Sequence, residues 1–157
     1  MLLRIPIVLA FLCLLTAVQA EVVFRENETL RVTIKTGKIE PVVRTALDIF
    51  KKDFKSVFQS DVVSADDGQV MVGTLGLSPE LESMLHKADL KVLKDNPEGF
   101  IIQVVGTKLL VLGADKRGTA YGILELSRLI GVSPWEWWAD ASIVSRAHYI
   151  FEDSFKR

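Results

Sequence analysis

The chain has 157 residues, of which 19 are basic and 20 acidic, and 49% of its residues are hydrophobic. This length predicts a single domain, and the near balance of charge argues against nucleic acid as a partner, because a protein that binds phosphates needs a basic face. Cys13 is the only cysteine, and the two histidines, His86 and His148, lie far apart in the sequence. We therefore expect no metal site and no disulfide.

Residues 1–20 have the pattern of a secretory signal peptide. Arg4 precedes an apolar run of 14 residues, Ile5–Val18, and Val18-Gln19-Ala20 places small residues at the −3 and −1 positions of a cleavage site. The run is shorter than the about 20 residues that a membrane span requires. We therefore predict cleavage after Ala20, a secreted or periplasmic protein without a membrane span, and a mature domain of residues 21–157.

The first half of the mature chain predicts two strands, a helix and two further strands. Val22–Phe24 and Leu30–Ile34 are rich in apolar residues that alternate with polar ones. Glu40–Phe58 has apolar residues at three- and four-residue spacing, which is typical of an amphipathic helix. Asp61–Ser64 and Gln69–Val72 then read as short strands on either side of a turn.

The second half predicts a short helix, a hairpin, a third helix and one or two C-terminal strands. In chain order these are a helix capped by Ser78 that ends near Ala88, the strands Gly99–Val105 and Lys108–Leu112, the helix Thr119–Ile130, and strands around Ile143 and Tyr149–Phe151. Strands that arrive in pairs between helices favour an α+β fold. We predict a two-layer sandwich in which about three helices pack on one face of a mixed, mostly antiparallel sheet.

The segment Gly113–Gly122 leads from a predicted strand into a helix. Free backbone N–H groups at a helix start, with Lys116 and Arg117 beside them, favour binding of a carboxylate or phosphate. The segment lacks the lysine of a phosphate-binding loop and the glycine spacing of a dinucleotide fingerprint, so we expect no cofactor. The alternative is structural: Gly118 allows a tight turn, and Gly122 lets the helix lie close to the sheet. Arg117 could likewise be structural, with its guanidinium paired to Asp115, Glu136 or Asp140, while Lys116 stays exposed.

Three tryptophans, Trp135, Trp137 and Trp138, stand within four positions. Indole rings offer a large apolar area with one N–H group, which suits stacking on sugars and packing between domains. We expect Trp137 and Trp138 to pack against another domain and Trp135 to contact a sugar. Glycoside hydrolysis needs two carboxyl groups across a cleft, whereas the adjacent pair Asp66-Asp67 lies in a turn, where we expect both side chains to be solvated.

The run Gly113–Asp140 closely resembles the N-terminal domain of glycoside hydrolase family 115. The resemblance rests on Arg117-Gly118-x-x-Tyr121-Gly122 and on Pro134-Trp135-Glu136-Trp137-Trp138, in which Glu136 stands where the family usually has an aromatic residue. The family comprises xylan α-1,2-glucuronidases, which remove (4-O-methyl)glucuronic acid side chains from glucuronoxylan. The resemblance implies an α+β accessory domain, like the non-catalytic domain of β-hexosaminidases, with substrate contacts from Lys116, Arg117, Tyr121 and Trp135.

In the family this domain precedes a (β/α)₈ barrel that supplies the catalytic acids, and such a barrel needs at least about 200 residues. The sequence has no positions to receive those acids. We therefore predict a catalytically silent accessory domain of a secreted α-glucuronidase-like hydrolase, whose partner is a missing catalytic barrel. The alternative is a free-standing carbohydrate-binding module that holds acidic glucuronoxylan through Lys116, Arg117 and the tryptophans.

Overall fold

The computed structural model describes residues 21–35, 39–139, 141–152 and 155–157. The predicted signal peptide and the predicted break at Thr36-Gly37-Lys38 lie outside these residues. Within them the elements follow in the order β1 (Glu21–Arg25), β2 (Leu30–Ile34), α1 (Pro41–Phe58), β3 (Val62–Ser64), β4 (Val70–Thr74), α2 (Pro79–Ser83), α3 (Lys87–Lys94), β5 (Phe100–Val105), β6 (Lys108–Gly113), α4 (Lys116–Leu129), α5 (Glu136–Ala139) and β7 (His148–Glu152).

The strands form a five-stranded sheet in the order β3-β2-β4-β6-β5 and a two-stranded sheet of β1 and β7. The predicted α+β sandwich with a mixed sheet is confirmed, and so is the antiparallel hairpin of β5 and β6. In the larger sheet, however, β2 pairs in parallel with β3 and β4, and β4 pairs in parallel with β6. The prediction of mostly antiparallel pairing is therefore wrong for this sheet, although β1 and β7 are antiparallel.

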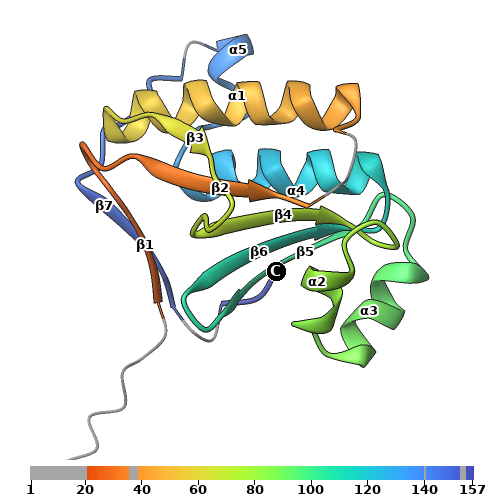
Figure 1. Ribbon diagram of the computed structural model, residues 1–157. Coiled ribbons are helices and arrows are strands. Elements are labelled where there is room, and N and C mark those ends of the chain that lie inside the picture. The colour runs from red at the N-terminus through yellow and green to blue at the C-terminus, as the bar shows by residue number, and fades with distance from the viewer. Residues whose placement is uncertain (1–20, 36–38, 140, 153–154) are drawn as a thin grey trace, which may run out of the picture.

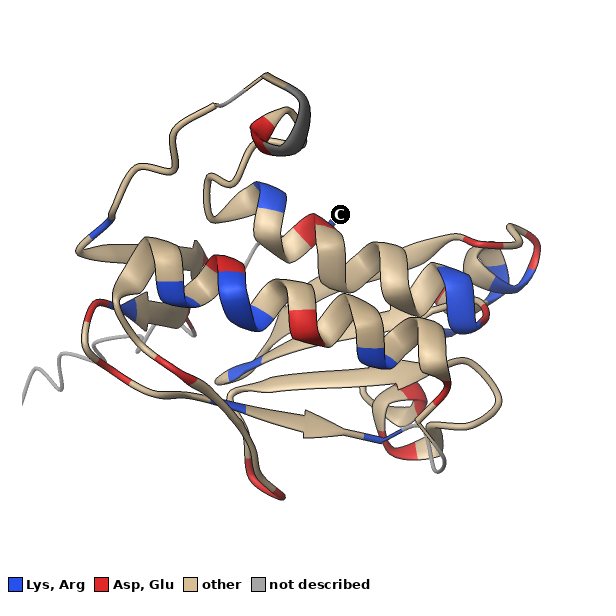
Figure 2. Ribbon diagram, turned by 90° about the horizontal axis from the view of Figure 1, so that it is seen from above, with Lys and Arg blue, Asp and Glu red and all other residues tan. Residues whose placement is uncertain are grey.

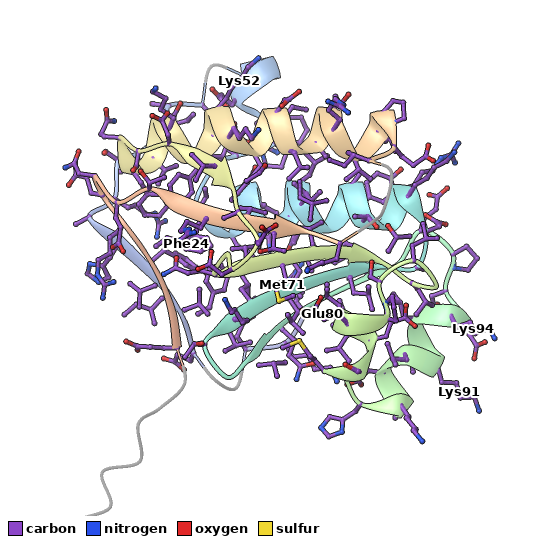
Figure 3. All side chains as sticks on the ribbon, viewed as in Figure 1. Phe24, Lys52, Met71, Glu80, Lys91 and Lys94 are labelled. Carbon is purple, nitrogen blue, oxygen red and sulfur yellow. The ribbon has the colours of Figure 1, made fainter. Side chains whose placement is uncertain are left out.

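Helices cover both faces of the five-stranded sheet, because its central strands are apolar on both sides. Val70, Val72 and Val111 face α1 and α4, while Met71 and Leu110 face α2 and α3 on the opposite side (Figures 1 and 3). All five residues are buried, as is usual for parallel strands that lie between two layers. The prediction that helices pack on one face holds for the two long helices only.

An aromatic cluster joins the small sheet to the first helix. The ring of Phe24 on β1 lies 5.6 Å from that of Phe54 on α1 and 5.1 Å from that of Phe151 on β7, both in edge-to-face geometry (Figure 3). Phe24 exposes 1% of its surface, and the other two rings are fully buried. Edge-to-face pairs add to the free energy of apolar burial, so this cluster holds the β1–β7 ribbon against the end of the sandwich.

The helix boundaries differ from the prediction at two places. The helix expected from Ser78 to Ala88 is two helices, α2 and α3, with a break before Lys87. Ser78 does occupy the N-cap position of α2, but its hydroxyl donates to the carbonyl of Lys35 and accepts the N–H of Thr74, so it links β2 to β4 instead of capping the helix. Strand β7 is present as predicted, whereas the chain around Ile143 forms no strand.

Candidate functional site

Helix α4 begins at Lys116, three residues before the predicted start, because Asp115 caps it. One carboxylate oxygen of Asp115, Oδ1, accepts the N–H groups of Arg117 at 2.8 Å and Gly118 at 2.9 Å. The other oxygen accepts the N–H of Glu98 at 3.0 Å. These three donors, led by the Gly118 N–H, hold the pKa of Asp115 below its usual range. The helix start expected to attract an external anion already holds an internal carboxylate.

The two predicted cations at this helix start have different surroundings. Arg117 Nη1 lies 2.7 Å from Oε1 of Glu98, and the two side chains expose 64% and 41% of their surfaces. The sequence did not predict Glu98 as a partner; this residue lies in a turn with a left-handed φ of 61°. Lys116 is exposed and Tyr121 exposes 46% of its surface one turn further along the helix. Arg117 is thus paired with Glu98 at the surface, whereas Lys116 and Tyr121 are exposed.

The glycines of the segment have structural reasons to be glycines. A Cβ on Gly118 would lie 2.1 Å from the carbonyl oxygen of Gly99, and a Cβ on Gly113 would lie 1.9 Å from the backbone nitrogen of Thr119. A Cβ on Gly122 would lie 2.8 Å from Cγ1 of Val111 on β6. Both parts of the structural alternative are therefore supported: the turn is tight, and the helix lies close to the sheet.

A pocket of about 330 Å³ lies at the carboxyl ends of the parallel strands, between the N-termini of α1 and α4. Such an edge is where open α/β sheets commonly bind ligands. Lys116 lines this pocket together with two carboxylate residues, Glu40 and Asp115. The rest of the lining is mainly apolar and includes Leu75 and Leu77. One ammonium group thus faces two carboxylates, which weakens the attraction for an anion that the sequence predicts.

The tryptophan segment follows α4 and forms the short helix α5. Trp135 exposes 65% of its surface, so its ring is available to a ligand or to another protein surface. Trp137 and Trp138 lie on α5, and their side chains, like all of Asp140, are outside the described part of the structure. The predicted packing role of those two rings therefore stays a prediction.

A second hollow, of about 190 Å³, lies on the outer face of the two long helices. We call it the α1/α4 groove; it is lined by Ile49, Asp53, Leu124, Ser127, Arg128, Val132, Ser133 and Pro134. Asp53 exposes 7% and Ser127 exposes 5% of its surface. Burial raises the pKa of Asp53, an effect that the nearby Ser127 hydroxyl and Lys52 oppose. Neither Asp53 nor Ser127 was predicted from the sequence as a functional residue.

One signal in the sequence could have drawn attention to this groove. Asp53 falls three residues after Phe50 and four before Val57, so it lies on the apolar stripe of α1. A carboxylate in such a stripe is buried at a cost in free energy unless a donor meets it. Asp53 is therefore visible in the sequence as a charged residue within the apolar stripe that predicts α1.

The described residues contain no group of three or more metal-ligating side chains that could hold an ion. No helix among them is both long and apolar enough to cross a membrane. Figure 2 shows Lys and Arg interspersed with Asp and Glu over α1 and α4, without a face of one sign.

Solved structures provide the comparison with known proteins. One of them, described as "a novel family GH115 4-O-Methyl-alpha-glucuronidase, BtGH115A, with specificity for decorated arabinogalactans", matches with a TM-score of 0.78 and 36% sequence identity over 86% of this chain. The match spans 18% of that protein's chain. A second structure, CpGH84D, aligns with a TM-score of 0.45 and 10% sequence identity over 83% of this chain and 22% of its own chain. No protein-family model and no curated protein matches the sequence.

The fold and this similarity together define a glycoside hydrolase-related α+β domain. More particularly, the chain is a domain related to glycoside hydrolase family 115, as the resemblance of Gly113–Asp140 implies. The matched part of the chain spans 18% of the length of the related glucuronidase.

Proposed function

We propose that this chain is the non-catalytic N-terminal domain of a secreted glycoside hydrolase that removes glucuronic acid or 4-O-methylglucuronic acid from polysaccharide side chains. The observation that carries the proposal is the coverage of the match: it takes in 86% of this chain and 18% of the related glucuronidase. One domain of a larger enzyme accounts for that difference in length. The Met1–Ala20 pattern supports export of the whole enzyme.

The carboxyl groups at the best-formed sites are unsuited to glycoside hydrolysis. A general acid for this reaction needs a raised pKa and an unoccupied proton position that faces the substrate. Asp115 has a lowered pKa, and both its oxygens accept backbone N–H groups. Asp53 has a raised pKa, but a groove of about 190 Å³ gives it no second carboxylate to act as nucleophile or base. We infer that the catalytic acids come from another domain.

The polysaccharide is the finer part of the proposal. The sequence resemblance implies glucuronoxylan, whereas the related glucuronidase is described as specific for decorated arabinogalactans. The shared element is the (4-O-methyl)glucuronic acid side chain. We propose that the enzyme recognises this sugar acid. The test below determines which polymer carries it.

The test is an activity measurement on the purified chain, residues 21–157, with glucuronoxylan and with arabinogalactan. We expect no release of glucuronic acid or of its 4-O-methyl form from either polymer. Release that survives repurification and is lost in Asp53→Asn or Glu40→Gln would overturn the accessory role, because the chain would then contain its own catalytic carboxylate.

The same preparation tests the alternative of a free-standing carbohydrate-binding module. The pocket beside Lys116 is the observation that favours it. Titration with glucuronate, followed by NMR, should then show weak binding that disappears in Lys116→Ala and persists in Lys91→Ala, an exposed lysine on α3 used as the control. If glucuronate does not bind at millimolar concentration, the module hypothesis fails and the accessory role is unaffected.

A further inference from the structure

Residues 155–157 lie along one edge of the five-stranded sheet and extend it. Strand β5 is the last strand in the order of that sheet, so its outer edge has no neighbour among the named strands. Ile102 and Arg157 each donate their N–H to the other's carbonyl at 2.8 Å, in an antiparallel pairing. The N–H of Val104 donates to the carbonyl of Phe155 at 3.2 Å. We call residues 155–157 the edge strap, because they cover the outer edge of β5.

The side chains of the edge strap reach the helices on both faces of the sheet. Lys156 Nζ lies 2.5 Å from Oδ1 of Asp89 on α3. On the opposite face, Arg157 Nε pairs with Oε1 of Glu125 on α4, and Phe155 packs against the apolar cluster under α1 and α4. Successive side chains of a strand point to opposite faces, so this alternation is that of a strand in register with β5.

Three features make the edge strap easy to release. Its two cations expose 48% and 52% of their side chains, so salt screens both ion pairs. Asp89, the partner of Lys156, and Gln103, which stands opposite Lys156, each have a buried side-chain oxygen without a hydrogen-bond partner among the described residues. Hydration of these two oxygens would offset part of the contacts that release removes. Glu125 would stay paired, because Arg128 lies 2.8 Å from both of its oxygens.

Strand β5 has no protection of its own against pairing with another strand. It contains no charged residue and no proline, and Gln103 is its only polar residue. Charges and proline are the usual means by which an edge strand avoids association. A six-residue segment of β-forming, uncharged residues pairs readily with identical segments once its edge is open. The strand that best fits the open edge is therefore another β5, and the charges of the edge strap are what the edge otherwise lacks.

We propose that the edge strap guards the outer edge of β5 and that its release lets β5 pair with β5 of a second copy of this chain. Low ionic strength keeps the strap closed, and high ionic strength opens it by weakening both ion pairs. In the paired state the N–H groups of Ile102 and Val104 bond to carbonyl groups of the second copy, as in any antiparallel pair of strands.

The experiment compares the purified chain, residues 21–157, with the double variant Lys156→Ser/Arg157→Ser, which we call the strap variant. The matched control is Lys91→Ser/Lys94→Ser, which removes the same charge from exposed positions on the outer side of α3 (Figure 3). The wild type in about 1 M sodium chloride tests release without any substitution.

The first readout is amide hydrogen exchange by NMR, at a concentration where the chain is monomeric. We expect the amides of Ile102 and Val104 to exchange at least about tenfold faster in the strap variant than in the wild type, and at the wild-type rate in the control. The second readout is sedimentation at higher concentration. The strap variant and the wild type in high salt should form a dimer in which exchange of the two amides slows again.

Wild-type exchange rates in the strap variant or in high salt would overturn the strap. Fast exchange in a chain that stays monomeric at every concentration would overturn the pairing with a second copy. Gln103→Lys, added to the strap variant, places a charge on β5 and should restore the monomer. A dimer that survives Gln103→Lys, or that Leu124→Glu in the α1/α4 groove dissociates, forms through another face and overturns the proposal as well.

Discussion

At the scale of single residues, Asp115 connects three segments that are distant in the sequence. Its carboxylate accepts N–H groups from the first turn of α4 and from the turn at Glu98, while its backbone continues from β6. The predicted helix start in this region is confirmed, three residues earlier than expected. The sequence did not predict that the Asp115 side chain accepts the free N–H groups of that first turn.

The first prediction concerns the free energy of unfolding of Asp115 variants. Asp115→Ala should lose about 1–2 kcal/mol at neutral pH, the usual cost of removing an N-cap side chain. Asp115→Asn, the matched control, should lose less because its amide oxygen can still accept the N–H groups of Arg117 and Gly118. Urea unfolding measures both; an Asp115→Ala variant as stable as the wild type would contradict the capping role.

The pH dependence of the same variants follows from the lowered pKa of Asp115. A carboxyl whose pKa is lower in the folded than in the unfolded chain contributes stability above its unfolded pKa and loses that contribution as the pH falls through the folded value. The difference in free energy of unfolding between wild type and Asp115→Ala should therefore be largest at pH 6–7 and decrease below about pH 4.

At the scale of elements, α4 fits against the sheet and the 98–99 turn only because glycines stand at its contact points. A Cβ at Gly118 meets the backbone oxygen of Gly99 at 2.1 Å, and a backbone atom cannot rotate away. A Cβ at Gly122 meets a side-chain methyl group of Val111 at 2.8 Å, which can move. The two positions therefore differ in how much an added methyl group disturbs the fold.

The second prediction compares Gly118→Ala with Gly122→Ala. Alanine favours a helix over glycine by about 1 kcal/mol, so a variant without a steric clash would be stabilised. Gly118→Ala should instead lose roughly 1–3 kcal/mol, because the first turn of α4 must shift away from Gly99. Gly122→Ala should lose less. A gain in the midpoint of urea unfolding for Gly118→Ala would show that the turn can yield and that the close approach is not required.

Helices and strands could be predicted from local residue patterns in the sequence. The pairing of strands that are distant in the sequence could not. The apolar periodicity of α1 and the turn between β5 and β6 gave those elements nearly the right bounds. Strands β3 and β4 are also neighbours in the sequence, yet β2 lies between them, and β1 pairs with β7 from the other end of the chain. Such choices depend on which faces bury each other, and a single sequence does not contain that information in its spacing. For the same reason Asp53 and Ser127 could not be placed together beforehand.

At the scale of the whole molecule, different helices and different side chains cover the two faces of the five-stranded sheet. Helices α2 and α3 cover one face with a closed apolar cluster that includes Leu81 and Leu93, whereas the outer surface of α1 and α4 keeps the groove with Asp53 and Ser127. The first face still exposes the side chain of Val92 on α3, by 62% of its surface. The second face carries a hollow lined by apolar and polar side chains.

The third prediction concerns that uncovered face in the isolated chain. Leu124 lines the groove on this face, and the exposed Trp135 directly follows Pro134 of the same lining, so the purified chain should bind a hydrophobic dye and associate weakly with itself as its concentration rises. Tryptophan emission should include a component typical of an exposed ring, since Trp135 exposes 65% of its surface. Leu124→Glu should reduce dye binding several-fold, because the charge interrupts the apolar surface, while Val92→Glu on the opposite side should not. Analytical ultracentrifugation and dye fluorescence measure these effects. A strictly monomeric chain that binds no dye and whose emission is that of fully buried rings would mean that this face is complete without a partner.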